Sequence, residues 1–296
     1  MDILVVGGTG FIGSYLSEAL VDRGHSVVTL SRNPDNDSVS DEIQHRMGDV
    51  TSYESIASAF EGIDVAINLV ALSPLFKPKG GDDAHFDVHL NGTKNIVQAA
   101  EDHDISCLVQ MSGLGADPNG KTAYLQAKGK AEEVVKDSDI EWVIFRPSVV
   151  FGDGGEFTEF TKLLTTPYVT GLPSGGSMQF QPIWVQDLVE MMATAVEENE
   201  YWNEIYEIGG PEVLTLAQVT KLVYQAEGKS VSILPIPKPF AKVGLTFADK
   251  IPGIPLGKDQ YRALDIDNTV TDNDINAFDV TESDLKTYRE YLNLKG

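Results

Sequence analysis

The chain has 296 residues, 42% of them hydrophobic, and a chain of this length buries roughly three quarters of its unfolded surface on folding. Lys and Arg total 22 against 45 Asp and Glu, so the net charge of −23 excludes a nucleic-acid-binding role. Acidic residues fall evenly on both halves of the chain, which favours solubility in high salt over a dedicated cationic partner. The lone Cys107 excludes an internal disulfide. With no basic leader and no apolar run of roughly 20 residues, we expect a cytoplasmic protein.

A glycine-rich turn near the start dominates the sequence. Residues 3–6 are all apolar and predict a strand buried on both faces, and from residue 11 onward apolar residues recur at helical spacing. Between them, glycines allow a sharp turn and a close approach of backbone to ligand, and the N–H groups that open the helix favour a diphosphate. We therefore expect a dinucleotide here. The predicted contacts are Gly7, Gly10, Phe11, Ile12 and Gly13.

The end of the second predicted strand, residues 26–30, bears on the choice of cofactor. An acidic residue there would accept hydrogen bonds from the adenosine ribose and repel a 2′-phosphate. This chain has Ser31 and Arg32 instead, a hydroxyl and a guanidinium that can hold a 2′-phosphate. We predict NADP, with NAD as the alternative; a solvated Arg32 at the start of a polar loop is the simpler interpretation.

Strands and helices continue to alternate along the chain. Strands are predicted near 43–47, 64–69 and 108–111, with helices between them, and Thr51 to Glu54 has capping-box spacing. This pattern predicts an α/β fold with a doubly wound parallel sheet, of the Rossmann type, over residues 1–150. Segments at about 180–210 extend it, and residues 151–296 form a smaller C-terminal α+β lobe. In such sheets ligands bind at strand ends, so Val70 and Ala71 are cofactor candidates.

Tyr124 and Lys128 lie one helical turn apart, so their side chains share a face. An ammonium beside a phenol stabilises the phenolate and lowers its pKa from about 10 toward neutrality. Ser112, at the end of a strand, can hold a carbonyl oxygen nearby. Together these groups can polarise a carbonyl for hydride transfer. A surface i, i+4 pair is the simpler alternative. His85 and His89 also lie one turn apart, but without a third ligand we predict no metal site.

In their order along the chain, these motifs resemble those of the extended and atypical short-chain dehydrogenase/reductases. The resemblance includes residues 48–50, 91–95 and 146–152 and covers about residues 1–210. It implies that Tyr124 is the acid/base, that Lys128 lowers the pKa of the phenol and contacts the nicotinamide ribose, and that Ser112 orients the substrate. It further implies a proton relay through Asn91, an adenine site at Asp49 and Val50, and nicotinamide contacts from Pro147 and Val149.

More narrowly, residues 181–188, 206–211 and 251–260 are similar to the branch that contains the NAD(P)H-binding accessory subunit of respiratory complex I. That branch includes members kept for cofactor binding without demonstrated turnover. An intact Tyr124 and Lys128 therefore does not by itself establish catalysis.

Basic residues are unevenly distributed in the second lobe. Between residues 147 and 228 only Lys162 and Lys221 are basic, too few for a nucleotide-sugar diphosphate, so an apolar or weakly charged substrate is expected. Residues 229–258 carry five lysines against one aspartate, among apolar residues. One interpretation is a peripheral contact with anionic lipid or with an acidic protein. The other is that the apolar residues pack on the lobe and the lysines are solvated.

Three functions stay open at this stage. The first is an NADPH-dependent oxidoreductase that acts on the carbonyl or carbinol of a small apolar substrate. The second is a cofactor-binding accessory or assembly subunit of a respiratory complex, located peripherally at the membrane. The third is a nucleotide-sugar epimerase or dehydratase, which the sparse second-lobe cations disfavour. The oligomeric state is not predicted.

Overall fold

The computed structural model describes residues 1–33, 42–237 and 266–294. The chain divides into two compact units. Unit 1 comprises residues 1–72, 79–146 and 185–207, and unit 2 comprises residues 73–78, 147–184 and 208–296.

Unit 1 is built on a seven-stranded sheet with the strand order β11-β6-β5-β4-β1-β2-β3. All pairs from β6 to β3 are parallel. The strands are β1 (Asp2–Val6), β2 (Ser26–Ser31), β3 (Gln44–Met47), β4 (Val65–Asn68), β5 (Cys107–Met111), β6 (Glu141–Pro147) and β11 (Glu204–Ile208). The predicted doubly wound sheet is thereby confirmed.

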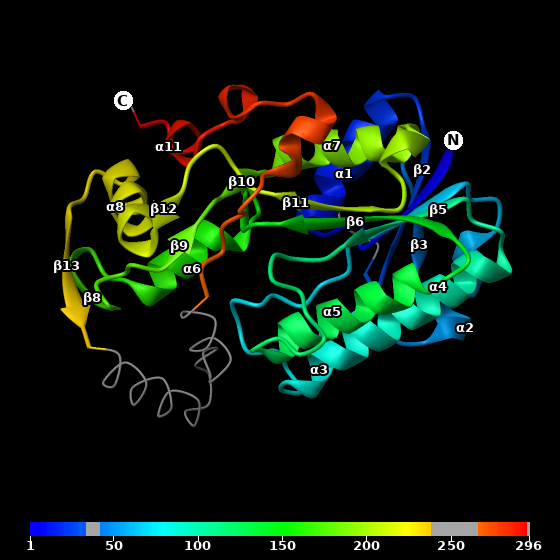
Figure 1. The fold of residues 1–296 in the computed structure, drawn as a ribbon, viewed down its shortest axis with the longest axis horizontal. Coiled ribbons are helices and arrows are strands. Elements are labelled where there is room, and N and C mark those ends of the chain that lie inside the picture. Colours follow the sequence, from blue (N-terminus) through cyan, green and yellow to red (C-terminus); the bar gives the residue numbers. More distant parts are fainter. Residues whose placement is uncertain (34–41, 238–265, 295–296) are drawn as a thin grey trace. The chain divides into compact units, whose positions relative to one another are not determined.

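Helices cover both faces of this sheet. Figure 1 shows α1 and α7 on one face and α4 and α5 on the other. The helical segments are α1 (Phe11–Asp22), α2 (Tyr53–Ile56), a 3-10 turn (Ala57–Phe60), α3 (Asp83–His85), a π-helical segment η2 (Phe86–Asn91), α4 (Gly92–Asp102), α5 (Ala123–Lys136), α7 (Val185–Glu197) and a 3-10 turn (Asn199–Tyr201). The central strands β4 and β5 are buried along their whole length, as strands covered on both faces must be.

The glycine turn between β1 and α1 depends on close backbone contacts. Gly7 has a φ of +87°, a conformation that side chains disfavour. A Cβ at Gly13 would lie 2.3 Å from the carbonyl oxygen of Gly7, so only glycine lets the helix pack this closely on the turn. The predicted role of Gly13 in helix packing is confirmed.

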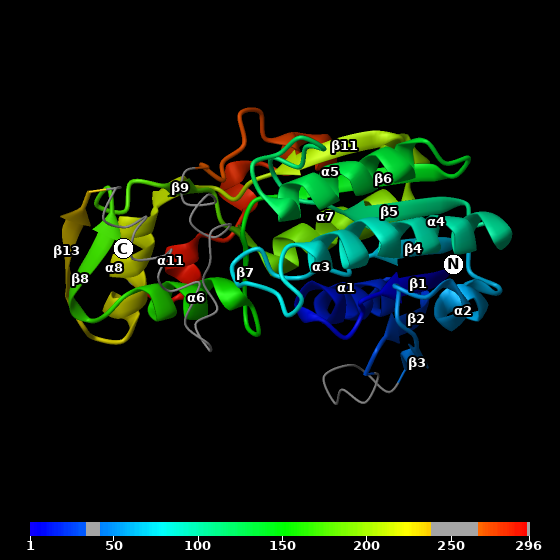
Figure 2. The same cartoon turned by 90° about the horizontal axis from the view of Figure 1, so that it is seen from below.

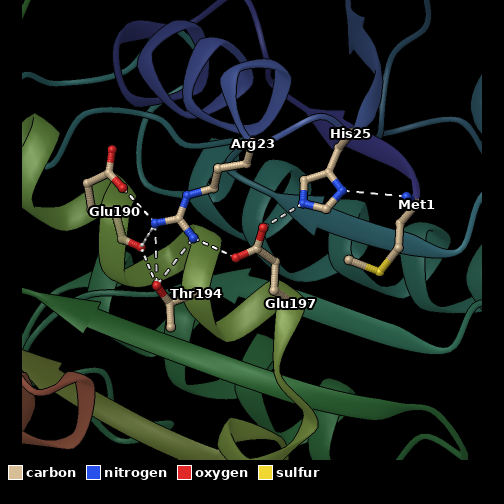
Figure 3. Close-up of polar contacts among 6 residues, drawn as sticks. All are labelled: Met1, Arg23, His25, Glu190, Thr194 and Glu197. Atoms are coloured by element: carbon tan, nitrogen blue, oxygen red, sulfur yellow. Dashed lines mark hydrogen bonds and ion pairs between the residues drawn. The ribbon is translucent and has the colours of Figure 1, made fainter.

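A charged cluster joins α1 to α7 (Figure 3). Arg23 donates to Glu197 and to Glu190, each at 2.6 Å, and lies within hydrogen-bond reach of the Thr194 hydroxyl. His25 Nε2 lies 2.8 Å from the other oxygen of Glu197. The cluster therefore fixes α7, which comes late in the sequence, against the first helix of the unit.

Unit 2 is assembled from short strands and helices. They are β7 (Val150–Phe151), α6 (Glu156–Leu164), β8 (Tyr168–Pro173), β9 (Gln179–Phe180), β10 (Ile183–Trp184), β12 (Leu214–Thr215), α8 (Leu216–Ala226), β13 (Val231–Ile236), two 3-10 turns (Asp274–Phe278 and Glu282–Asp284) and α11 (Tyr288–Tyr291). The strands form the two-stranded pairs β7–β10, β8–β13 and β9–β12. Figure 2 shows β8 and β13 side by side next to α8. Tyr288, which is fully buried, packs against Phe151 and Phe157 in the core of this unit.

Asn268 ties the C-terminal segment into unit 2. Its Oδ1 accepts hydrogen bonds from the Ser148 hydroxyl and the Val149 N–H, both at 2.8 Å. Its backbone N–H donates to Gln179, and its carbonyl accepts from Gln181 N–H. The segment that begins at residue 266 thus supports residues 148 and 149, which connect β6 to β7.

At two helix N-termini, capping-box spacing in the sequence can be compared with the structure. Thr215 and Gln218, which also have capping-box spacing, form a capping box at the start of α8. The one predicted at Thr51 and Glu54 is wrong: α2 begins after Ser52, and the Thr51 hydroxyl donates to Asp49 instead. Among the residues that the structure describes, no helix combines the length and apolarity needed to cross a bilayer.

Candidate active site

A cavity of about 320 Å³ lies at the carboxyl ends of β1, β2 and β4. The glycine turn forms one wall and the chain after β4 forms another. The lining residues are Gly7, Thr9, Gly10, Leu30, Ser31, Arg32, Asn33, Gly48, Asp49, Val50, Thr51, Leu69, Val70, Ala71, Leu72 and Val88. Most of the predicted cofactor residues of unit 1 therefore line one cavity. Phe11, Ile12 and Gly13 are the first residues of α1, directly after this turn.

The cavity lining includes Ser31 and Arg32, the residues expected to distinguish NADP from NAD. Arg32 is exposed, and the Ser31 hydroxyl oxygen has no hydrogen-bond partner among the described residues although it is buried. Asp49 accepts hydrogen bonds from the N–H and hydroxyl of Thr51, which, with the nearby Arg32, lower the pKa of its carboxyl. The donors present fit a nicotinamide dinucleotide, because the glycine turn leaves room for a diphosphate and Ser31 has an unused hydroxyl.

Tyr124 and Lys128 both project from α5. The Lys128 side chain is almost fully buried, and its Nζ donates to the carbonyl of Met111 at 2.8 Å. Burial lowers the pKa of Lys128 to about 8, although Glu132 acts in the opposite direction. Burial raises the pKa of Tyr124 to about 12. The expected lowering of the phenol pKa is thus not found, because desolvation raises it.

Ser112 lies at the end of β5, where its hydroxyl donates to Glu132 Oε1 at 2.5 Å. Glu132 is 1% exposed and also accepts two hydrogen bonds from Arg146, from Nε at 2.9 Å and Nη2 at 2.6 Å. Ser112 therefore belongs to a buried network that joins β5, α5 and β6. The Ser112 proton is used in the bond to Glu132, and the substrate-orienting role of Ser112 stays a prediction.

The residue that faces the phenol is Gly113. A Cβ at this position would lie 3.0 Å from Oη of Tyr124. The phenol of the acid/base candidate therefore occupies the space that a side chain at residue 113 would need.

Two histidines pack against Tyr124 from the preceding helical segments. His85 ends α3 and His89 lies in the π-helical segment η2. Their rings stack with centroids 5.5 Å apart, and each meets the Tyr124 ring nearly at a right angle, at 5.7 and 5.4 Å. Burial, Lys128 and His85 lower the pKa of His89 well below its usual value, so this ring is neutral at pH 7.

The remaining predicted residues are placed differently. Asn91 is exposed and its amide donates to Asp87 at 3.4 Å, so its contacts give no support for the expected relay. Pro147 and Val149 belong to unit 2, where the Val149 N–H is bonded to Asn268. Among the described residues, no group of three or more His, Cys, Asp or Glu side chains could hold a metal.

Three residues of the site escaped the sequence analysis. Glu132 follows Lys128 by one helical turn, so its spacing was a usable signal that Glu132 shares that face. His89 was considered only as a metal ligand. Nothing in the sequence indicated Gly113, because a glycine here only makes room for the Tyr124 phenol.

Comparison with known proteins agrees with this geometry. A family model described as NAD(P)H-binding matches residues 7–166, more than half of the chain. The chain is 27% identical to the mitochondrial NADH dehydrogenase [ubiquinone] 1 alpha subcomplex subunit 9 of Arabidopsis thaliana, over 91% of this chain and 71% of that protein. It is 25% identical to the NADH-ubiquinone oxidoreductase 40 kDa subunit of Neurospora crassa, over 80% of this chain and 63% of that protein.

Enzymes are also among the relatives. The chloroplastic divinyl chlorophyllide a 8-vinyl-reductase of Cucumis sativus is 27% identical, over 80% of this chain and 59% of its own length. In both the 40 kDa subunit and this reductase, the match spans less than two thirds of the relative.

Solved structures share the fold. A nucleoside-diphosphate-sugar epimerase from Staphylococcus aureus has a TM-score of 0.73 at 17% identity, with 99% of each chain covered. The Thermus thermophilus UDP-glucose 4-epimerase complex with NAD has a TM-score of 0.67 at 24% identity, over 80% of this chain and 86% of that one. These likenesses show the fold alone. With its family match and its relatives, the chain belongs to the NAD(P)H-binding family, as an extended short-chain dehydrogenase/reductase-like protein near the complex I 40 kDa subunit branch.

Proposed function

We propose that the protein is an NADPH-dependent oxidoreductase that reduces the carbonyl of a small apolar substrate, or oxidises the matching carbinol. The observation that carries the proposal is the Tyr124 phenol, which burial keeps protonated, on one helix with the buried ammonium of Lys128. A protonated phenol is the form that can donate to a carbonyl oxygen as it gains electrons.

The roles of the residues follow from these contacts. A bound reduced nicotinamide supplies the hydride. Tyr124 Oη gives its proton to the substrate oxygen, and Lys128 stabilises the phenolate that is left. Lys128 is held by one hydrogen bond, to Met111, and no other bond from Nζ occurs among the described residues, so N–H donors remain for ribose hydroxyls.

The test is steady-state oxidation of NADPH with a panel of small ketones and quinones. Tyr124→Phe and Lys128→Met should each lower kcat at least a hundredfold. The Kd for NADPH should change less than threefold in Tyr124→Phe and should rise in Lys128→Met, which also loses the donors to the ribose. Tyr168→Phe, which alters an exposed tyrosine of unit 2, is the matched control and should keep full activity. Turnover that survives in Tyr124→Phe would refute the assignment.

The preference for NADPH rests on Arg32 and the unpartnered hydroxyl of Ser31. Arg32→Gln should weaken NADPH binding at least tenfold and leave NADH binding unchanged, because only NADPH carries the 2′-phosphate. Lys136→Gln removes an exposed positive charge outside the cavity and controls for net charge. Equal losses for both nucleotides, or tighter binding of NADH by the unaltered protein, would contradict the preference.

The second candidate is a cofactor-binding accessory or assembly subunit of a respiratory complex, without turnover. The similarity to a complex I subunit over 91% of this chain supports this candidate. The proposed docking segment, residues 229–258, lies mostly outside the described residues. Recovery of the native protein in a membrane fraction, lost on changing Lys238 and Lys242 to Glu, together with NADPH binding without turnover, would favour this candidate over the enzyme.

A further inference from the structure

His89 lies between the nucleotide cavity and the phenol. Its Nε2 accepts a hydrogen bond from the backbone N–H of Leu72 at 3.4 Å, and Leu72 lines the cavity. The preceding residue, Val88, lines the same cavity. On its other side the His89 ring meets the Tyr124 ring at 90° with centroids 5.4 Å apart. A continuous series of contacts thus runs from the cavity wall to the acid/base candidate.

The hydrogen bond to Leu72 also defines which nitrogen of His89 carries a proton. In a neutral imidazole one nitrogen accepts and the other donates. Because Nε2 accepts from Leu72, the proton is on Nδ1. This Nδ1–H is buried and has no hydrogen-bond partner among the residues that the structure describes.

A buried donor without an acceptor is costly, and an apolar ring of the same size would avoid that cost. The backbone around His89 is unusual as well. Residues 86–91 form a π-helical segment, a rare and less favourable conformation that is frequent at functional sites. His89 thus combines an unpartnered buried donor with an unfavourable backbone conformation, next to the acid/base candidate. We expect this combination in a residue that is retained for function.

We propose that His89 is a positioning residue for Tyr124: its ring, oriented by the Leu72 N–H, holds the phenol in the place from which Oη can donate to the substrate. The inference rests on the proposed oxidoreductase function. It differs from the expected relay through Asn91, because the histidine contacts the phenol and the asparagine is exposed.

Three variants of the full-length protein separate orientation from packing. His89→Phe keeps a ring but removes the acceptor for Leu72 N–H. His89→Gln restores an acceptor near the place of Nε2. His85→Phe removes the other buried imidazole, which has the same kind of ring contact with Tyr124.

We expect His89→Phe to lower kcat at least tenfold while KM and the Kd for NADPH stay within twofold. His89→Gln should recover kcat to within threefold of the unaltered protein, and His85→Phe should lower kcat less than His89→Phe does. The melting temperature of His89→Phe should change little, because the variant removes one unpartnered donor, Nδ1–H, and leaves another, the Leu72 N–H, without its acceptor. A merely structural histidine would show the reverse, with lower stability and unchanged kcat per folded molecule.

Nitrogen-15 NMR of the histidines supplies a measurement that needs no turnover. His89, assigned by its loss in His89→Phe, should be a neutral ring protonated at Nδ1. A ring protonated at Nε2, full kcat in His89→Phe, or an equal loss in His85→Phe would overturn the inference. Absence of turnover in the unaltered protein would instead refute the proposed function, so the two failures are distinguishable.

Discussion

Gly113 lets the Tyr124 phenol lie close to the backbone, since a Cβ at residue 113 would lie 3.0 Å from Oη. Few Cβ atoms approach an oxygen so closely, so any side chain at 113 must displace the phenol or be displaced by it. The position of the acid/base group is therefore sensitive to a residue that has no functional group of its own.

Gly113→Ala should lower kcat about tenfold, because a shift of a few tenths of an ångström moves the phenol from its reacting position. The Kd for NADPH should not change, since Gly113 does not line the nucleotide cavity. Steady-state kinetics and a calorimetric titration check both statements. An alanine variant with full kcat would show that Tyr124 can move without loss.

Ser112→Ala should act on stability more than on catalysis. The variant removes one of the donors to the buried carboxylate of Glu132, and leaving such a group less satisfied costs about 1–2 kcal/mol. Denaturant unfolding should show this loss, while kcat stays within threefold because the bonds from Arg146 remain. A large fall in kcat without a change in stability would restore Ser112 to the substrate site.

Lys128 should make stability depend on pH. The pKa of Lys128 is about 8 in the native protein, against 10.5 as the ordinary value. The unfolded chain therefore holds more protons between these values, so the free energy of unfolding rises with pH there, by up to about 3 kcal/mol. Unfolding of the unaltered protein and of Lys128→Met between pH 8 and 10 should show a difference that grows with pH. Parallel pH curves would contradict the shifted pKa.

Arg23→Met should destabilise unit 1 by about 1 kcal/mol, because Arg23 bridges two carboxylates of α7 and is only partly exposed. Burial raises the pKa of Glu197, but hydrogen bonds from His25 and Arg23 outweigh it and leave the pKa lowered. The contribution of Glu197 should thus be present above about pH 4.5 and fade as pH falls through its lowered native value. Glu190→Gln should destabilise the unit less than Arg23→Met does, because the Glu190 side chain is 61% exposed. A loss in Arg23→Met that is unaffected by salt would argue against an ionic origin.

The sequence predicted the sheet because its signal is local. The fully apolar residues 3–6 and the alternation of strands with helices were sufficient to predict a doubly wound architecture. The start of α2 was not predicted correctly, because a hydroxyl with capping-box spacing can bond elsewhere, as Thr51 does with Asp49. The pairing of β8 with β13 joins residues about 60 positions apart and has no local signature.

The site was predictable in its residue types but not in its electrostatics. The spacing of Tyr124 and Lys128 correctly placed both on α5. The direction of the phenol pKa was wrong, since desolvation depends on tertiary burial that spacing does not report. His89 was considered only as a metal ligand, for a related reason: its contact with Tyr124 is a tertiary contact that spacing does not report.

The bonds of Asn268 have a consequence for how the chain can be divided. They join residues 148, 149, 179 and 181 to a segment that begins after residue 265, and none of them involves residues 238–265. A polypeptide that ends near residue 237 and a separate peptide of residues 266–296 would together still contain every one of these partners. If the two fragments bind each other, the residues at the expected nicotinamide side can be reassembled from two separately produced pieces.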